Sequence, residues 1–69
     1  MAELRIVVSG AAGRMGRMVA RAIHEATGMT LAGALEREDS PWLGHDPGPL
    51  AGCPATGLAI VAEIAAAAS

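Results

Sequence analysis

The chain has 69 residues, 52% of them hydrophobic and 17% charged, and its net charge is −2 at pH 7. This composition is typical of one small globular domain and excludes a disordered chain, while five arginines against seven acidic residues leave no basic excess for a nucleic-acid partner. Cys53 is the single cysteine, which excludes an internal disulfide and a cysteine metal cluster, so we expect no metal site.

The first two predicted elements are a strand and a helix. Leu4 to Ser9 form a nearly continuous apolar run, as in parallel strands that are covered on both faces. Residues 14–27 have helical spacing, and Gly28 is placed to end the helix in a left-handed conformation. We expect one stripe of this helix to pack into the core, namely Met15, Met18, Val19, Ala22 and Ala26.

A second strand is predicted over Met29 to Leu35. Strand, helix and strand form one βαβ unit with a right-handed crossover, so the two strands should run parallel. The segment from Ser40 to Gly57 contains four prolines, so we expect a functional or mobile loop without a long regular element. A short third strand over Leu58 to Val61 is predicted next, followed by the start of a helix over Ala62 to Ala68.

The predicted fold class is α/β, a Rossmann-type parallel sheet with flanking helices, present as an N-terminal portion. At most three strands and two helices cannot cover the faces and edges of such a sheet, so we expect a longer protein. The apolar stretch over residues 55–69 contains Glu63 and is shorter than the roughly 20 residues of a membrane span. We therefore expect a soluble, cytoplasmic protein with no membrane partner, consistent with a reducing compartment.

A glycine-rich turn lies between the first strand and the helix. Ser9 to Gly16 contain the pattern G-x-x-G-x-x-G, a variant of the dinucleotide-binding G-x-G-x-x-G. Small residues let the backbone approach a pyrophosphate, and the helix N-terminus offers unpaired N–H groups and about half a positive charge. The positive charge of Arg14 is unfavourable at the N-terminus of a helix, where the helix dipole is also positive. A bound phosphate would make the local charge negative and the arginine favourable. The alternatives are a tight turn without ligand and a solvated arginine.

Two charged residues follow the second strand. Glu36 lies 20 residues after Gly16, where a carboxylate accepts hydrogen bonds from the ribose 2′-hydroxyl of a dinucleotide. Arg37 would contact a 2′-phosphate or lie across the adenine, so the pair would tolerate either NADH or NADPH. The alternative is a charged strand end in solvent.

Four other side chains are of types that often take part in ligand binding or catalysis. Trp42 is expected to anchor the proline-rich loop rather than to stack on a ligand. No catalytic role is assigned to the remaining three, which are His24, His45 and Cys53.

Three motifs in order give a resemblance to a known family. They are the run from Ser9 to Gly16 with its G-R-M-G, the run from Ala34 to Gly44 with its E-R-x-x-S-x-x-x-G, and the D-x-G-x-L-A-G of Asp46 to Gly52. Together they resemble the N-terminal domain of bacterial dihydrodipicolinate reductases, also called 4-hydroxy-tetrahydrodipicolinate reductases. The resemblance covers nearly the whole chain, and residues 1–69 would be the N-terminal part of the dinucleotide-binding domain.

The resemblance implies a reductase of diaminopimelate and lysine biosynthesis that transfers hydride from NADH or NADPH to a cyclic dicarboxylate. Glu36 would hold the adenosine ribose, and Arg37 would assist with NADPH. The catalytic residues, the dicarboxylate site and most of a homotetramer interface would belong to a later domain, so this chain alone should be inactive. The pyrophosphate would be lined by Gly10, Ala11, Ala12, Gly13, Arg14 and Met15.

Two other functions use a similar βαβ unit. A non-catalytic nucleotide sensor would need the same glycine turn, and fold alone does not separate it from the reductase. A methyltransferase would need no anion site, so Arg14 and the helix N-terminus would lose their purpose. ADP-ribose and S-adenosylhomocysteine would distinguish the methyltransferase from the nucleotide binders.

Overall fold

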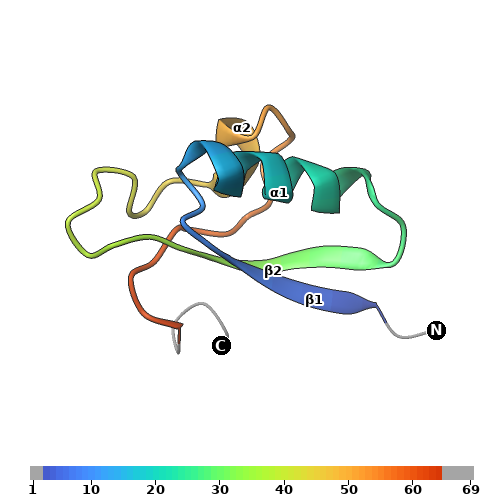
Figure 1. Ribbon diagram of the computed structural model, residues 1–69, viewed down its shortest axis with the longest axis horizontal. Coiled ribbons are helices and arrows are strands. Elements are labelled where there is room, and N and C mark those ends of the chain that lie inside the picture. The colour runs from blue at the N-terminus through green and yellow to red at the C-terminus, as the bar shows by residue number, and fades with distance from the viewer. Residues whose placement is uncertain (1–2, 65–69) are drawn as a thin grey trace.

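The computed structural model describes residues 3–64 (Figure 1). The elements follow in the order β1 (Leu4–Ser9), α1 (Arg14–Glu25), β2 (Met29–Leu35) and α2 (Pro47–Leu50). β1 and β2 pair in parallel, and α1 lies across one face of this sheet (Figure 1). The first two predicted strands are confirmed in their bounds, and so is the α/β class with a Rossmann-type parallel sheet.

A third segment adds to the free side of β2, but only at one point. Val61 forms a parallel bridge with Leu35, and its N–H donates to the Ala34 carbonyl at 3.0 Å. The predicted strand over Leu58–Val61 is otherwise wrong, because the backbone of Ile60 is used elsewhere. Its N–H donates to the His45 carbonyl at 2.8 Å, and its carbonyl accepts from Gly44 N–H at 2.8 Å. The predicted helix over 62–68 lies largely outside the described residues.

The helix α1 buries a different face from the one predicted. Its buried residues are Gly16, Ala20 and Ile23, whereas Met15 is 74% exposed and Met18 is 64% exposed. The predicted stripe is therefore wrong by about one position around the helix. Small side chains at positions 16 and 20 let the helix axis approach the sheet closely, which bulky methionines would prevent.

The helix also ends earlier than predicted, at Glu25. Ala26 has extended dihedrals and donates its N–H to the Ile23 carbonyl at 3.2 Å. Gly28 does adopt a left-handed conformation, with φ of 86°, but it belongs to the turn that enters β2. Its carbonyl accepts from Leu4 N–H at 2.9 Å, so it ties the start of β1 to that turn rather than capping α1.

A small aliphatic core joins these elements. Five buried residues form it, and Trp42, Leu43 and Leu50 from the segment after β2 pack against it. The predicted anchoring role of Trp42 is thus confirmed. The core residues are Val8, Ala11, Ile23, Ala34 and Ile60.

The proline-rich segment is organised by Asp46. Its carboxylate caps α2 by accepting from Gly48 N–H at 2.8 Å. It also accepts from Thr56 N–H at 3.0 Å, Thr56 Oγ1 at 2.8 Å and Gly57 N–H at 2.9 Å. Partial burial by itself raises the pKa of Asp46, but these hydrogen bonds outweigh it and hold the pKa below its ordinary value of 3.8. A segment predicted as a loop is therefore ordered around one carboxylate, with α2 as its only helix among the described residues.

Replacing Asp46 by asparagine is expected to lower the free energy of unfolding by about 1–2 kcal/mol at neutral pH, because an amide must place its own donors against three N–H groups. The folded-state pKa of Asp46 is depressed, so its contribution is present above the ordinary value of 3.8 and is lost as the pH falls through the folded value. Urea unfolding followed by the fluorescence of the single tryptophan would measure both effects. Asp39→Asn, at an exposed carboxylate, is the control, and equal losses in the two variants would contradict the expectation.

Candidate functional site

The turn between β1 and α1 is built on close backbone contact. Gly10 has φ of 70°, and its carbonyl accepts from Gly13 N–H at 3.0 Å. A Cβ at position 16 would lie 2.7 Å from the Gly10 carbonyl carbon and 2.8 Å from Ala11 Cα, so the first turn of α1 rests directly on the turn backbone. Glycine is therefore required at position 16 by packing, independently of any ligand.

Some N–H groups of this turn donate to other backbone atoms, whereas those at the start of α1 have no acceptor within the helix. Ala11 N–H donates to the Leu35 carbonyl at 3.0 Å, which ties the turn to the end of β2. In the first turn of α1 the N–H groups have no acceptor within the helix, and the N-cap Gly13 supplies no side-chain cap. No acidic residue lies in that turn either. The donors available to an anion thus include the N–H groups of Arg14 and Met15, beside the exposed Arg14 side chain.

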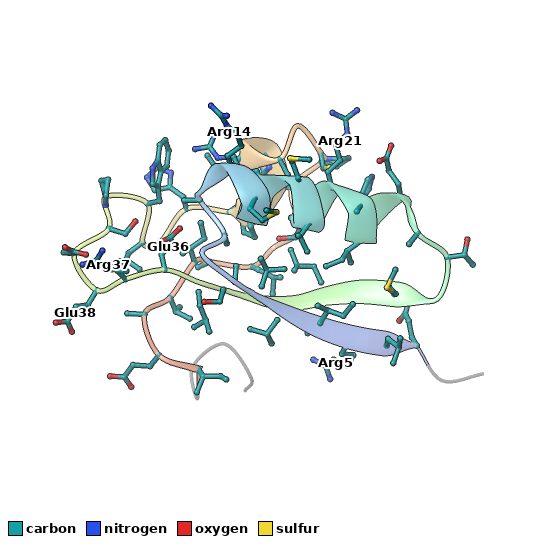
Figure 2. All side chains as sticks on the ribbon, in the orientation of Figure 1. Arg5, Arg14, Arg21, Glu36, Arg37 and Glu38 are labelled. Atoms are coloured by element: carbon teal, nitrogen blue, oxygen red, sulfur yellow. The ribbon has the colours of Figure 1, made fainter. Side chains whose placement is uncertain are left out.

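Glu36 reaches this turn from the end of β2. Its Oε2 accepts from Ala12 N–H at 2.8 Å, and its Oε1 accepts from Arg37 N–H at 3.3 Å. The residue is half-buried, and Figure 2 shows its side chain beside the turn that connects β1 to α1. The structure therefore brings together two features that the sequence separates, the glycine turn and the carboxylate after β2.

Arg37 lies further out, on the segment that leaves the sheet (Figure 2). Its side chain is 86% exposed, and its Nε is 3.7 Å from Asp39 Oδ1. An ion pair this exposed contributes about 1 kcal/mol or less, so the guanidinium is free to exchange Asp39 for another anion. The structure does not place Arg37 against the glycine turn.

A hollow borders the glycine turn on the side of β1. Its wall is formed by β1 residues and by Gly10, Gly13, Arg14, Met15 and Val19. A separate hollow between α1, β2 and residues 48–56 contains His24 and Cys53 and shares no residue with the turn. Four of the residues predicted to line a pyrophosphate therefore share one concave surface, whereas the buried Ala11 and the half-buried Ala12 do not line it.

Arg17 contacts the turn although the sequence did not assign it there, and Trp42 contacts Arg17. Arg17 Nε donates to the Ala12 carbonyl at 2.8 Å, and its guanidinium carbon lies 5.3 Å from the centre of the Trp42 ring. Trp42 in turn meets His45 edge-on, with ring centroids 5.2 Å apart. The sequence places Arg17 one turn beyond Gly13, but it does not show that the loop after β2 folds back to meet it.

Neither a metal-binding cluster nor a membrane-spanning helix is found within residues 3–64. No cluster of three or more His, Cys, Asp or Glu side chains is placed there to hold a metal ion. In the same part of the chain, every helix is too short or too polar to cross a membrane.

Comparison with known proteins agrees with this geometry. Residues 4–69 match the family described as "Dihydrodipicolinate reductase, N-terminus". The chain is 59% identical over 63 residues to the 4-hydroxy-tetrahydrodipicolinate reductase of Parvibaculum lavamentivorans, a match covering 90% of this chain and 23% of the relative. Its identity to the reductases of Rhodopseudomonas palustris BisA53 and Bradyrhizobium diazoefficiens is 52% over 64 residues, covering 93% of this chain and 23% and 24% of those proteins. The chain thus spans about a quarter of the length of these relatives, and it belongs to the dihydrodipicolinate reductase family as an N-terminal segment.

Proposed function

We propose that this chain supplies part of the cofactor site of an NAD(P)H-dependent reductase that converts 4-hydroxy-tetrahydrodipicolinate to tetrahydrodipicolinate in diaminopimelate and lysine biosynthesis. The observation that carries the proposal is the 2.8 Å bond between Glu36 and Ala12 N–H beside an uncapped helix N-terminus. A carboxylate thus lies beside a helix N-terminus, which supports a ribose acceptor and an anion site of the kind that a dinucleotide requires. Residues 1–69 would form the first part of the dinucleotide-binding domain.

The glycine turn would hold the pyrophosphate. Gly10 and Gly13 carry no side chain above the backbone, and the N–H groups of Arg14 and Met15 would donate to the phosphate oxygens. The Arg14 guanidinium, which opposes the helix dipole in the free protein, would then face a negative group. Ala11 and Ala12 would shape the turn through their backbone, since both of their N–H groups already have acceptors.

Glu36 would bind the adenosine ribose. A carboxylate has about four acceptor positions, of which Ala12 N–H and Arg37 N–H occupy two. The remaining positions would accept from the ribose hydroxyls without releasing the turn.

When bound, the nicotinamide nucleotide supplies the hydride. No residue of this chain is given a catalytic role. The dicarboxylate site and the homotetramer contacts of the complete protein, which we propose to be cytoplasmic, would lie in the rest of its length. No nucleic-acid or membrane partner is proposed.

The proposal is tested by calorimetric titration of a chimeric reductase, in which this chain replaces the matching segment of the Parvibaculum lavamentivorans relative. ADP-ribose, which contains the ribose and pyrophosphate but no nicotinamide, should bind, whereas S-adenosylhomocysteine should not. Binding of S-adenosylhomocysteine alone would overturn the dinucleotide assignment. Binding of ADP-ribose without reductase activity would favour the nucleotide sensor.

Arg37→Ala in the chimeric reductase is expected to weaken NADPH binding about tenfold, because an exposed charge-assisted contact to the 2′-phosphate is lost. Binding of NADH, which has no such phosphate, should change by less than about twofold. Asp39→Asn is the matched variant, since it removes the competing anion and should leave NADPH binding equal or slightly tighter. Equal losses of NADH and NADPH in Arg37→Ala would remove the role proposed for this residue.

A further inference from the structure

The peptide that precedes the N-cap of α1 is held at both of its polar atoms. The carbonyl of Ala12 accepts from Arg17 Nε at 2.8 Å, and the N–H of Gly13 in the same peptide donates to the Gly10 carbonyl at 3.0 Å. On the other side of the Ala12 Cα, the Ala12 N–H is held by Glu36 at 2.8 Å. The two peptides around this Cα therefore have little rotational freedom.

The Arg17 side chain is itself supported. Arg17 is half-buried, and its guanidinium lies over the Trp42 ring at 5.3 Å. A planar guanidinium stacks on an aromatic face while still donating from its edge, which an ammonium cannot do. The contact thus leaves Nε–H directed at the Ala12 carbonyl.

Trp42 belongs to a segment that is firmly tied down. Its own N–H donates to Ser40 Oγ at 3.1 Å and its carbonyl accepts from His45 N–H at 3.0 Å. Gly44 and His45 are each bonded to the backbone of Ile60, a core residue, at 2.8 Å. The indole therefore provides a fixed platform for Arg17 rather than a mobile contact.

We propose that Arg17, backed by Trp42, is a positioning residue for the cofactor: it fixes the Ala12–Gly13 peptide so that the N–H groups of Arg14 and Met15 point at the pyrophosphate. This inference rests on the proposed function. Gly13 is the N-cap, so the orientation of the peptide before it sets the direction in which α1 begins. Supporting bonds of this kind hold a binding group in its productive geometry, although they do not touch the ligand.

Arg17→Ala in the chimeric reductase is the test. It should raise the dissociation constant for ADP-ribose and the KM for NADH about tenfold, equivalent to 1.4 kcal/mol, with kcat changed by less than about twofold. Trp42→Leu keeps an apolar side chain against the core but removes the platform, and should raise the same constants about threefold. Because the two residues act as one unit, the double variant should lose no more than Arg17→Ala alone.

Two further variants separate positioning from charge and from general stability. Arg17→Lys keeps the charge but not the planar donor, so it should recover little of the affinity; full recovery would overturn the proposal. Arg21→Ala removes an exposed arginine of the same helix, whose Nε lies 3.8 Å from Glu25 Oε1, and should leave ADP-ribose binding unchanged. An Arg17→Ala variant that binds as tightly as Arg21→Ala would also overturn it.

If Arg17→Ala does not fold, Trp42→Leu and Arg17→Lys decide the question. Failure of the parent chimera to bind ADP-ribose would overturn both the proposed function and this inference, whereas normal binding in all the Arg17 and Trp42 variants would overturn only the inference.

Discussion

Gly16→Ala is expected to destabilise the folded domain by about 3 kcal/mol, even though the same change in a free helix would stabilise it by about 1 kcal/mol. The added Cβ would lie 2.7 Å from the Gly10 carbonyl carbon and 2.8 Å from Ala11 Cα, and both atoms are backbone. They cannot move without separating α1 from β1, because Ala11 is 1% exposed and its N–H is bonded to Leu35.

The loss would be measured as a fall in the urea midpoint of the chimeric reductase, with Gly13→Ala as the control. Both variants add one methyl group to a glycine, but a Cβ at position 13 meets only the Gly10 carbonyl oxygen, at 3.3 Å. Gly13→Ala should therefore change the free energy of unfolding by about 1 kcal/mol or less. Equal midpoints for the two alanine variants would show that the close approach at position 16 does not limit stability.

Gly13→Val is expected to weaken ADP-ribose and NADH binding at least about a hundredfold, equivalent to 2.8 kcal/mol, with a much smaller effect on folding. Gly13 has φ of −76° and ψ of 169°, which valine adopts without strain. Its two methyl groups would stand at the mouth of the first turn of α1 and cover the N–H groups of Arg14 and Met15. Isothermal titration calorimetry measures the affinity, and thermal unfolding without nucleotide measures the stability.

The two glycine variants should thus separate the two uses of the turn. Position 16 serves packing, so its variant should unfold early, whereas position 13 is proposed to serve the ligand, so its variant should fold and bind poorly. Unchanged calorimetric affinity in Gly13→Val would contradict a pyrophosphate at this turn, whatever the result at position 16.

The parts of the fold that the sequence predicted are set by local pattern. The apolar run of β1, the glycines after it and the charged residues after β2 mark the ends of these two strands, whose predicted bounds agree with the structure. The predicted buried stripe of α1 was wrong because it was chosen by hydropathy, which ranks large apolar side chains such as Met15 and Met18 above glycine and alanine. The helix instead packs through Gly16 and Ala20, whose small size allows close approach to the sheet.

The candidate site likewise combines a feature that local sequence predicts with contacts that depend on the fold. Glu36 could be placed by its distance from the glycine turn, although its bond to Ala12 N–H depends on the pairing of β1 with β2. The contacts of Arg17 could not be predicted, since they depend on the path of the segment that carries Trp42. That path is set by backbone bonds from Gly44 and His45 to Ile60, which leave no periodic signal in the sequence.

The bond between Glu36 and Ala12 N–H has a consequence for the thermodynamics of binding. The carboxylate is already immobilised in the free protein, so the conformational entropy of this side chain is lost when the chain folds and not when a nucleotide arrives. A 2′,3′-diol that meets the carboxylate therefore forms its hydrogen bonds without ordering that acceptor first. Discrimination between a ribose and a 2′-deoxyribose at this position would accordingly appear mainly in the enthalpy of association.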